Sequence, residues 1–276
     1  MDAETNLASG KGHRDENFPV ASLLLKREYR APIMAFYRFA RAADDVADNP
    51  EAAPHDKLRR LAAMRDGLDG AGDSVEAVAL HHAMTERSID STHARELLHA
   101  FERDITVGRY ADWDDLIGYC RYSAMPVGRY VLDVHGEDRA CWPASDALCA
   151  ALQVINHLQD CGKDYRTIDR VYIPADALAA KGAHVEDLGA PAATPPLRAA
   201  IIMLAERTQG LLRQSAAFAG MIRDRRLSAE VAVIQRLAES LTRRLLTCDP
   251  LSERVHHRSY ESGVLAARAI VGNLFA

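Results

Sequence analysis

The segment 32–48 reads PIMAFYRFARAADDVAD, and this stretch indicates how the rest of the chain folds. Its apolar residues at positions 33, 36, 37 and 40 recur at the spacing of one helix face. Pro32 suits the first turn of a helix, where its missing N–H leaves no hydrogen bond unmade, so we expect the helix to begin there. The same helix ends in the acidic run DDVAD at 44–48.

The composition extends the helical prediction to all 276 residues. Hydrophobic residues make up 48% and charged residues 26%, which is typical of a globular chain and excludes global disorder. Alanine is abundant and aromatic residues reach only 6%, a mixture that favours helices over sheets. The net charge is −5, whereas nucleic-acid binders carry an excess of basic residues, so we expect no nucleic-acid partner.

We expect one domain over residues 1–276, with residues 1–16 as a flexible N-terminal segment. The loop 189–196 alone has a linker-like composition, but helices of the same amphipathic style lie on both sides of it. The five cysteines contain no C-x-x-C pair and are odd in number, which indicates reduced thiols in a cytosolic compartment. No segment resembles a signal peptide or reaches the roughly 18 apolar residues of a membrane span. The sequence therefore predicts a cytoplasmic protein.

Capping residues and prolines predict where the other helices begin and end. Asp112, with Asp115 three residues later, resembles a capping pair for a long helix that ends near Gly136. Pro126 should kink this helix or divide it in two. The remaining expected helices are 75–87 capped by Ser74, a helix from Thr92 as its cap to about Gly108, and then 144–164, 176–181, 196–223, 228–247 and a terminal helix after Pro250.

The first acidic motif places two like charges together. Asp44 and Asp48 lie four residues apart, so both carboxylates share one helix face. The C-terminal end of a helix is also an unfavourable place for negative charge. Arg41 lies one turn earlier and compensates only in part, so the motif predicts a further cation.

The second motif is a polar row in an otherwise apolar helix. Asn156, Asp160 and Asp164 follow one another at four-residue spacing, and Gln153 extends the row. Carboxylates on a mostly buried helix face are costly unless they are paired or bind metal. Oxygen ligands suit magnesium, which combines few protein carboxylates with substrate phosphate oxygens, and no histidine–cysteine cluster has the spacing of a zinc site. We therefore expect the two motifs to face one another around a magnesium–diphosphate site.

Together with three further motifs, these two resemble the squalene/phytoene synthase family of class I isoprenoid synthases. The resemblance extends from about Asn17 to the last helix. It implies an all-α, single-domain helical bundle that binds a prenyl diphosphate and Mg²⁺. The matching stretches are NFPVAS at 17–22, AFYRFAR at 35–41 leading into DDVAD at 44–48, YCRYSAMPVG at 119–128, LQVINHLQDCGKD at 152–164 and RVYIP at 170–174.

The resemblance also implies roles for the residues that match. Magnesium would be held by Asp44, Asp48, Asn156, Asp160 and Asp164. Diphosphate would be contacted by Tyr37, Arg41, Arg170, Tyr172 and Arg258. The substrate channel would be lined by Phe18, Tyr119, Val127, Gly128 and Gln153, and Gly128 would be small because a long isoprenoid passes close to the backbone.

Departures from the family pattern indicate one branch of it. Dehydrosqualene and presqualene diphosphate synthases have an arginine before the second-motif aspartate, whereas this chain has Gln159 before Asp160. The first motif begins with Asn17 rather than serine. Both variants look like bacterial hydroxysqualene synthases, which ionise presqualene diphosphate and let water capture the rearranged cation without NADPH. We hypothesise that Gln159 makes room for this water or orients it, with Tyr119 and Asn17 as the other candidates.

The sequence leaves two alternatives open. The chain could join two prenyl diphosphates head to head, as presqualene diphosphate, phytoene and dehydrosqualene synthases do. It could instead be a non-catalytic helical subunit that supports a partner enzyme, although intact aspartates in both motifs argue against this. We expect a monomer or a homodimer. Because substrate and product are lipids, peripheral contact with the inner face of the membrane is a further hypothesis.

Overall fold

The computed structural model describes residues 25–258 together with residues 261, 263, 265 and 269. Within this part of the chain every regular element is a helix, apart from an isolated parallel bridge between Arg109 and Val171. The all-α class expected from composition is thus confirmed. The α-helices are α1 Arg27–Asp48, α2 Pro54–Gly67, α3 Val75–Thr85, α4 Thr92–Thr106, α5 Trp113–Ser123, α6 Met125–His135, α7 Trp142–Ile168, α8 Ala175–Lys181, α9 Pro195–Gln214, α10 Phe218–Met221 and α11 Arg225–Thr247, with 3₁₀ turns η1 Arg139–Cys141 and η2 Val185–Gly189.

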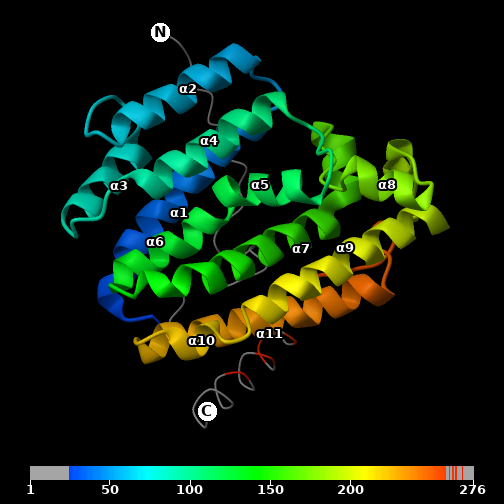
Figure 1. Ribbon diagram of the computed structural model, residues 1–276. Helices are drawn as coiled ribbons and strands as arrows, with labels where there is room; N and C mark the ends of the chain where they lie inside the picture. Colours follow the sequence, from blue (N-terminus) through cyan, green and yellow to red (C-terminus); the bar gives the residue numbers. More distant parts are fainter. Residues whose placement is uncertain (1–24, 259–260, 262, 264, 266–268, 270–276) are drawn as a thin grey trace.

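Two long helices organise the bundle. Helix α1 packs against α2, α3, α4 and α6, whereas α7 packs against α5, α6, α9 and α11 (Figure 1). Helix α6 therefore contacts both. The two acidic motifs lie on these two organising helices, at the end of α1 and in the C-terminal half of α7.

Several predicted boundaries are confirmed. The Ser74 hydroxyl caps α3 by accepting the N–H of Ala77, and Asp112 caps α5 by accepting the N–H of Asp115 at 2.9 Å. The chain divides between α5 and α6, directly before Pro126, because proline cannot donate the hydrogen bond that would continue the helix. Helix α6 ends at His135, and Gly136 directly after it has a φ of 66°, a left-handed conformation that favours glycine.

The prediction that a helix begins at Pro32 is wrong. Helix α1 begins at Arg27, and Pro32 lies inside it. Pro32 has no N–H to offer the carbonyl of Glu28 one turn earlier, and the guanidinium of Arg87 donates to that carbonyl instead. The hydroxyl of Tyr130 donates to the Pro32 carbonyl at 3.3 Å, and its ring stacks on Phe36 with centroids 4.1 Å apart. Tertiary contacts therefore compensate for the proline.

Two other helix predictions need correction. Thr92 is the first helical residue of α4 rather than its cap, and its N–H donates to the Asp90 carboxylate at 2.8 Å. The expected helix 196–223 divides after Gln214. There the buried hydroxyl of Ser215 bonds to the side chain of Gln235 on α11 at 2.8 Å, which ties the end of α9 to its neighbour.

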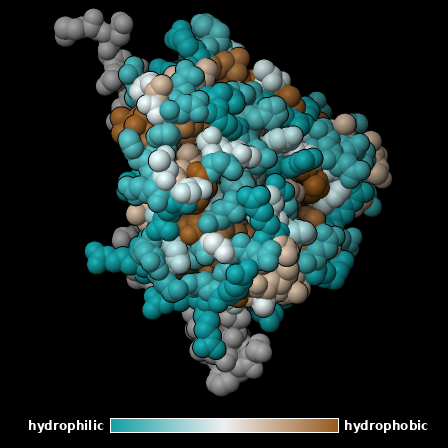
Figure 2. Space-filling model, turned by 60° about the vertical axis from the view of Figure 1, so that its left-hand side comes forward, coloured by the Kyte–Doolittle hydropathy of each residue, from teal (hydrophilic) through white to brown (hydrophobic). Residues whose placement is uncertain are grey.

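The N-terminal segment 1–16 lies outside the described residues, and so does much of the terminal helix expected after Pro250. All five cysteines are free thiols. Across the described residues, no helix has both the length and the apolar character that crossing a membrane requires. The face in Figure 2 is largely hydrophilic, and its apolar side chains appear in small separate patches.

Candidate active site

The first acidic motif forms one wall of a polar cavity. Tyr37, Arg41, Asp44 and Asp48 follow one another along one face of α1. Arg41 donates to the Asp44 carboxylate at 2.6 Å and to that of Asp45 at 2.8 Å. One guanidinium thus pairs with two carboxylates and balances their negative charge only in part, as expected from the sequence.

The second motif forms the facing wall. Gln153, Asn156, Asp160 and Asp164 line the same cavity from α7, while intervening apolar residues of that helix are buried in the core. The Nε2 atom of His256, in the loop after α11, lies 3.9 Å from a carboxylate oxygen of Asp160. The structure therefore brings together two motifs that are more than one hundred residues apart in sequence.

We call this space the polar cavity, and its volume is about 360 Å³. It lies where α1, α4 and α7 all approach their C-terminal ends. Besides the two motifs it is lined by Ala40, Phe101, Asp104, Tyr119, Ser123, His157, Ile168, Arg170 and Tyr172.

The carboxylates of the cavity carry more negative charge than their neighbours balance. Burial, and then the charge of Asp48, raises the pKa of Asp44 to about 7 against the opposing effect of Arg41. Burial and the charge of Asp160 raise the pKa of Asp164 to about 7 as well. Shifts of this kind mark a site that needs further positive charge.

The donor set fits a divalent cation of the magnesium type. Its members are four carboxylates and the amide of Asn156, all with oxygen donors, as hard cations prefer. In the described part of the chain, no three carboxylate, histidine or cysteine side chains are arranged to hold an ion by themselves. Magnesium commonly combines few protein carboxylates with water and substrate oxygens.

Arg170 and Tyr172 reach the cavity because two loops pair beneath it. The N–H of Val171 donates to the Gly108 carbonyl at 2.9 Å, and the N–H of Ala175 donates to the Tyr110 carbonyl at 2.9 Å. This pairing fixes the chain after α7 against the chain after α4. Arg170 then donates to the Asp48 carboxylate at 2.6 Å and joins the first motif from the opposite side.

Asp104 and His157 are site residues that the sequence reasoning missed. Asp104 accepts the hydroxyl proton of Tyr119 at 2.8 Å, and both side chains are buried. His157 stacks on Tyr172 with ring centroids 3.4 Å apart, and its Nε2 lies 3.1 Å from the amide nitrogen of Gln153. Burial, with the charge of Arg170, lowers the pKa of His157 to about 3, so this ring is neutral.

A signal for Asp104 was present in the sequence. The apolar face of α4 includes Leu97, Leu98 and Phe101, and Asp104 continues that face one turn later. A carboxylate on the apolar stripe of an amphipathic helix must be paired or functional. His157 had no comparable signal, because a lone histidine on an apolar helix is commonly a core residue.

A second polar cavity, of about 640 Å³, lies on the other side of Asp104 and Arg170. Lys57 lines it together with residues 107–109, which include Arg109, and residues 167–170. Asp48, Asp104, Ile168 and Arg170 line both polar cavities and form the partition between them.

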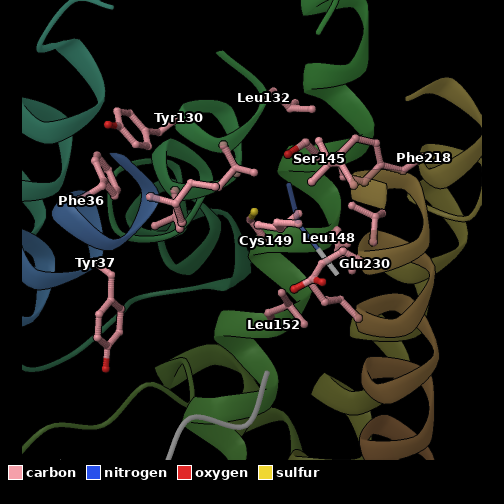
Figure 3. A pocket seen from close by; sticks show the side chains of 18 of the residues that line it. Phe36, Tyr37, Tyr130, Leu132, Ser145, Leu148, Cys149, Leu152, Phe218 and Glu230 are labelled. Carbon is pink, nitrogen blue, oxygen red and sulfur yellow. The ribbon is translucent and has the colours of Figure 1, made fainter. Parts of the chain in front are cut away.

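An apolar cavity of about 310 Å³ adjoins the polar cavity. Tyr37 and Ala40 line both spaces, so the two meet at the middle of α1. Figure 3 shows Phe36, Tyr130, Leu148 and Leu152 around it, with the carboxylate of Glu230 on α11 among them. Val127 and Gly128 line this apolar cavity as well.

Gly128 lines the apolar cavity and also lies at a close contact between α6 and α7. A Cβ at this position would lie 2.5 Å from Ser145 Oγ and 2.6 Å from Cys149 Sγ, both on α7. The glycine thus lets α6 and α7 approach closely, and the apolar cavity lies beside that contact.

Three predicted site residues are not placed in a cavity wall. Gln159 is buried at 5% exposure but lines none of the three cavities, because neighbouring helical residues point about 100° apart and Asp160 faces the site. Arg258 is exposed, and its backbone N–H donates to Glu261 at 2.6 Å. Phe18 lies outside the described residues.

Comparison with known proteins gives concordant matches. The family model for squalene/phytoene synthases matches residues 12–261. A hydroxysqualene synthase from Zymomonas mobilis is 57% identical over 273 residues, covering 98% of this chain and 92% of that protein. A hydroxysqualene synthase from Rhodopseudomonas palustris is 53% identical over 262 residues, covering 95% of this chain and 90% of that protein.

Solved structures give the same fold. A squalene synthase from Alicyclobacillus acidocaldarius is 30% identical and superposes with a TM-score of 0.71, covering 82% of this chain and 88% of that one. A dehydrosqualene synthase crystallised with a ligand is 19% identical and superposes with a TM-score of 0.81, covering 94% of this chain and 92% of that one. The second match concerns the fold alone.

Proposed function

The chain belongs to the squalene/phytoene synthase family, and from this premise we propose that it is a hydroxysqualene synthase. The substrate is presqualene diphosphate. Its carbon–oxygen bond to diphosphate breaks, the carbocation rearranges, and the oxygen of a water molecule bonds to it with loss of a proton. The products are hydroxysqualene and diphosphate. No electrons are gained or lost by the protein, so no NADPH is required.

One observation carries the proposal, namely that a polar and an apolar cavity meet at Tyr37 and Ala40. Presqualene diphosphate has the same two-part character, with a charged head and a long hydrocarbon body. The polar cavity would receive the diphosphate and the apolar cavity the hydrocarbon. The bond that breaks would then lie near the middle of α1.

We propose that the polar cavity holds Mg²⁺, the divalent cation that its oxygen donors fit. Asp44 and Asp48 would hold it from α1, and Asn156, Asp160 and Asp164 from α7. When bound, the ion supplies positive charge that stabilises the leaving diphosphate. Class I isoprenoid synthases generally use a divalent metal, which agrees with this assignment.

The chain's own cations and hydroxyl groups would orient the diphosphate. Arg41 and Arg170 lie at the two ends of the first motif, each already bonded to a carboxylate of it. Tyr37 and Tyr172 add polar groups to the wall. A preorganised set of donors stabilises developing negative charge more than mobile water does.

The apolar wall would protect the cation until it has rearranged. Val127, Leu148 and Leu152 offer no nucleophile, and Ser145, Cys149 and Glu230 are the polar exceptions in this wall. We therefore propose that water captures the cation mainly on the polar side. Tyr119 and Gln153 line the polar cavity and are the neutral polar groups that we propose for holding the quenching water. Gln159, buried behind the wall, would support α7 rather than touch the water.

We propose further that one isoprenoid synthase domain spans residues 1–276, which agrees with the extent of the family match. Contact with a membrane surface would let the enzyme exchange its lipid substrate and product. Flotation with liposomes tests this point, and an absence of association would remove it.

Incubation of the purified protein with presqualene diphosphate and Mg²⁺, without NADPH, tests the function. We expect equal amounts of hydroxysqualene and diphosphate, and loss of both in Asp44→Asn and Asp164→Asn. Condensation of farnesyl diphosphate with presqualene diphosphate left unchanged would instead identify a head-to-head synthase. Turnover of neither substrate by the folded protein would support a non-catalytic subunit.

A further inference from the structure

Asp104 is a buried acid with no part in the proposed metal site. It lies on α4, near the C-terminal end of the helix, and is 8% exposed. We propose that Asp104 is the positioning residue for water capture: it orients the hydroxyl of Tyr119 and receives, through that hydroxyl, the proton which water releases. This inference rests on the proposed function and adds a residue that neither motif contains.

The hydrogen bond between the two side chains sets the orientation of Tyr119. The Tyr119 hydroxyl donates to Oδ2 of Asp104 at 2.8 Å, across the contact between α5 and α4. Tyr119 is 3% exposed and lines the polar cavity. Since its proton is directed at Asp104, the hydroxyl oxygen can accept a hydrogen bond from a water molecule on the cavity side.

The second carboxylate oxygen of Asp104 indicates that the group does more than hold a tyrosine. Oδ1 is buried and has no hydrogen-bond partner among the described residues. A buried oxygen without a partner is costly, and in native proteins such groups are few. A fixed donor on Oδ1 would favour the charged carboxylate, so its absence suits an acid that takes up and releases a proton.

The position of Asp104 also provides an outlet. Asp104 belongs to the partition between the polar cavity and the second polar cavity. A proton taken up from the side of Tyr119 can therefore leave toward water on the side lined by Lys57 and Arg109. It need not pass back through the chamber that holds the carbocation.

The step balances in atoms and charge. The water oxygen forms a bond to the cationic carbon while one of its O–H bonds breaks, and that proton passes to the Tyr119 oxygen. The original Tyr119 proton passes to Oδ2 of Asp104, so the carboxylate becomes a neutral acid. Loss of this proton to water in the second polar cavity restores the starting state.

The other groups near Tyr119 are less suited to this role. His157 is stacked on Tyr172 and contacts Gln153, and the structure gives it no bond to Tyr119. Arg170 is a cation and cannot accept a proton. The carboxylates of the two motifs would be engaged with metal, whereas Asp104 stays free to accept the proton.

The variants Asp104→Asn and Tyr119→Phe, with presqualene diphosphate and Mg²⁺, test the inference. Asparagine can still accept the tyrosine hydrogen bond but cannot take its proton. We expect diphosphate release within about fivefold of the wild type, while the hydroxysqualene fraction of the products falls about tenfold or more in favour of elimination and other captured products. Tyr119→Phe should act in the same way, and the double variant should lose no more than either single one.

Three controls make the result decisive. Asp104→Glu keeps a carboxylate and should restore part of the hydroxysqualene fraction. Asp146→Asn breaks an ion pair with Arg129 outside the polar cavities and should leave the product ratio unchanged. For the wild type in D₂O, where folding of a variant plays no part, the hydroxysqualene fraction should fall while diphosphate release stays constant.

A hydroxysqualene fraction within about twofold of the wild type in Asp104→Asn would overturn the inference, since a general acid or base contributes far more. Loss of diphosphate release in the folded variant would also overturn it, because Asp104 would then serve ionisation. An unchanged product ratio in D₂O would overturn it independently of any variant. If the wild type itself forms no hydroxysqualene, the proposed function fails, which is a distinguishable result.

Discussion

Replacement of Asp104 by asparagine should make the protein more stable at neutral pH and above. Burial, reinforced by the charge of Asp48, raises the pKa of Asp104 from 3.8 to about 7, against the opposing effects of Arg170 and Tyr119. Between these two values the folded protein retains a proton that the unfolded chain has released. Stability therefore falls as pH rises through this interval, and the loss is complete above pH 7.

The size of the effect follows from the same shift. At about 1.4 kcal/mol per pH unit, Asp104 removes at most about 4 kcal/mol from the free energy of unfolding between pH 4 and pH 8. Asparagine does not titrate, so Asp104→Asn escapes this loss. The stability difference between variant and wild type should thus grow with pH by a few kcal/mol.

Urea unfolding at pH 5, 6, 7 and 8, in EDTA so that no cation binds the carboxylates, measures this difference. Asp164 titrates in both proteins and its contribution largely cancels, whereas the pKa of Asp44, which the charge of Asp104 helps to raise, should fall slightly in the variant. The matched control Asp73→Asn removes an exposed acid in the loop between α2 and α3, and its stability difference is the baseline for comparison with Asp104→Asn. A pH-independent difference for Asp104→Asn would refute the reasoning, because it would mean that Asp104 is as well solvated as an exposed acid.

Three further outcomes follow from the site and its packing. Gly128→Ala should lower the free energy of unfolding by about 1–3 kcal/mol, because the new Cβ overpacks the contact between α6 and α7. The control Gly118→Ala places its Cβ in open space and should not lower it. Equal urea midpoints for the two variants would contradict this prediction. Inorganic diphosphate with Mg²⁺, at about 100 times its dissociation constant, should raise the free energy of unfolding by about 2.7 kcal/mol. The effect should be seen as a rise in Tm, which EDTA reverses and which Asp164→Asn does not show. Arg170→Gln should lower kcat/KM for presqualene diphosphate about tenfold or more, because Asp48 loses its partner, whereas the exposed Arg109→Gln should change it less than about threefold. Equal losses in the two arginine variants would show that net charge alone matters.

The helical fold could be predicted because local signals agree along most of the chain. Apolar spacing, Ser74, Asp112 and Gly136 each correspond to hydrogen bonds or backbone angles in the structure. The start of α1 could not be predicted in this way. Pro32 lies inside the helix, and Arg87, from beyond the next two helices, donates to the carbonyl that the proline leaves unpaired.

The site was predictable where residue types repeat at helical spacing and not where tertiary contacts create it. The rows on α1 and α7 could be read from spacing, and the structure brings them to one cavity. The apolar stripe of α4 marks Asp104 as unusual, but its pairing with Tyr119 is visible only once α4 packs against α5, because the two residues are on different helices. Gln159 illustrates the reverse case, since adjacency to Asp160 in sequence does not place it on the same face of α7.

The convergence of three helix ends at the polar cavity has a consequence for the order in which ligands arrive. The C-terminal ends of α1, α4 and α7 each contribute about half a negative charge, in addition to the carboxylates. We therefore expect the protein without bound cations to repel a diphosphate anion, so that cations enter first or together with it. Thermodynamic linkage then requires that metal and substrate raise each other's affinity by the same factor. The magnesium concentration would consequently control how tightly the enzyme binds its substrate, in addition to the rate of the reaction.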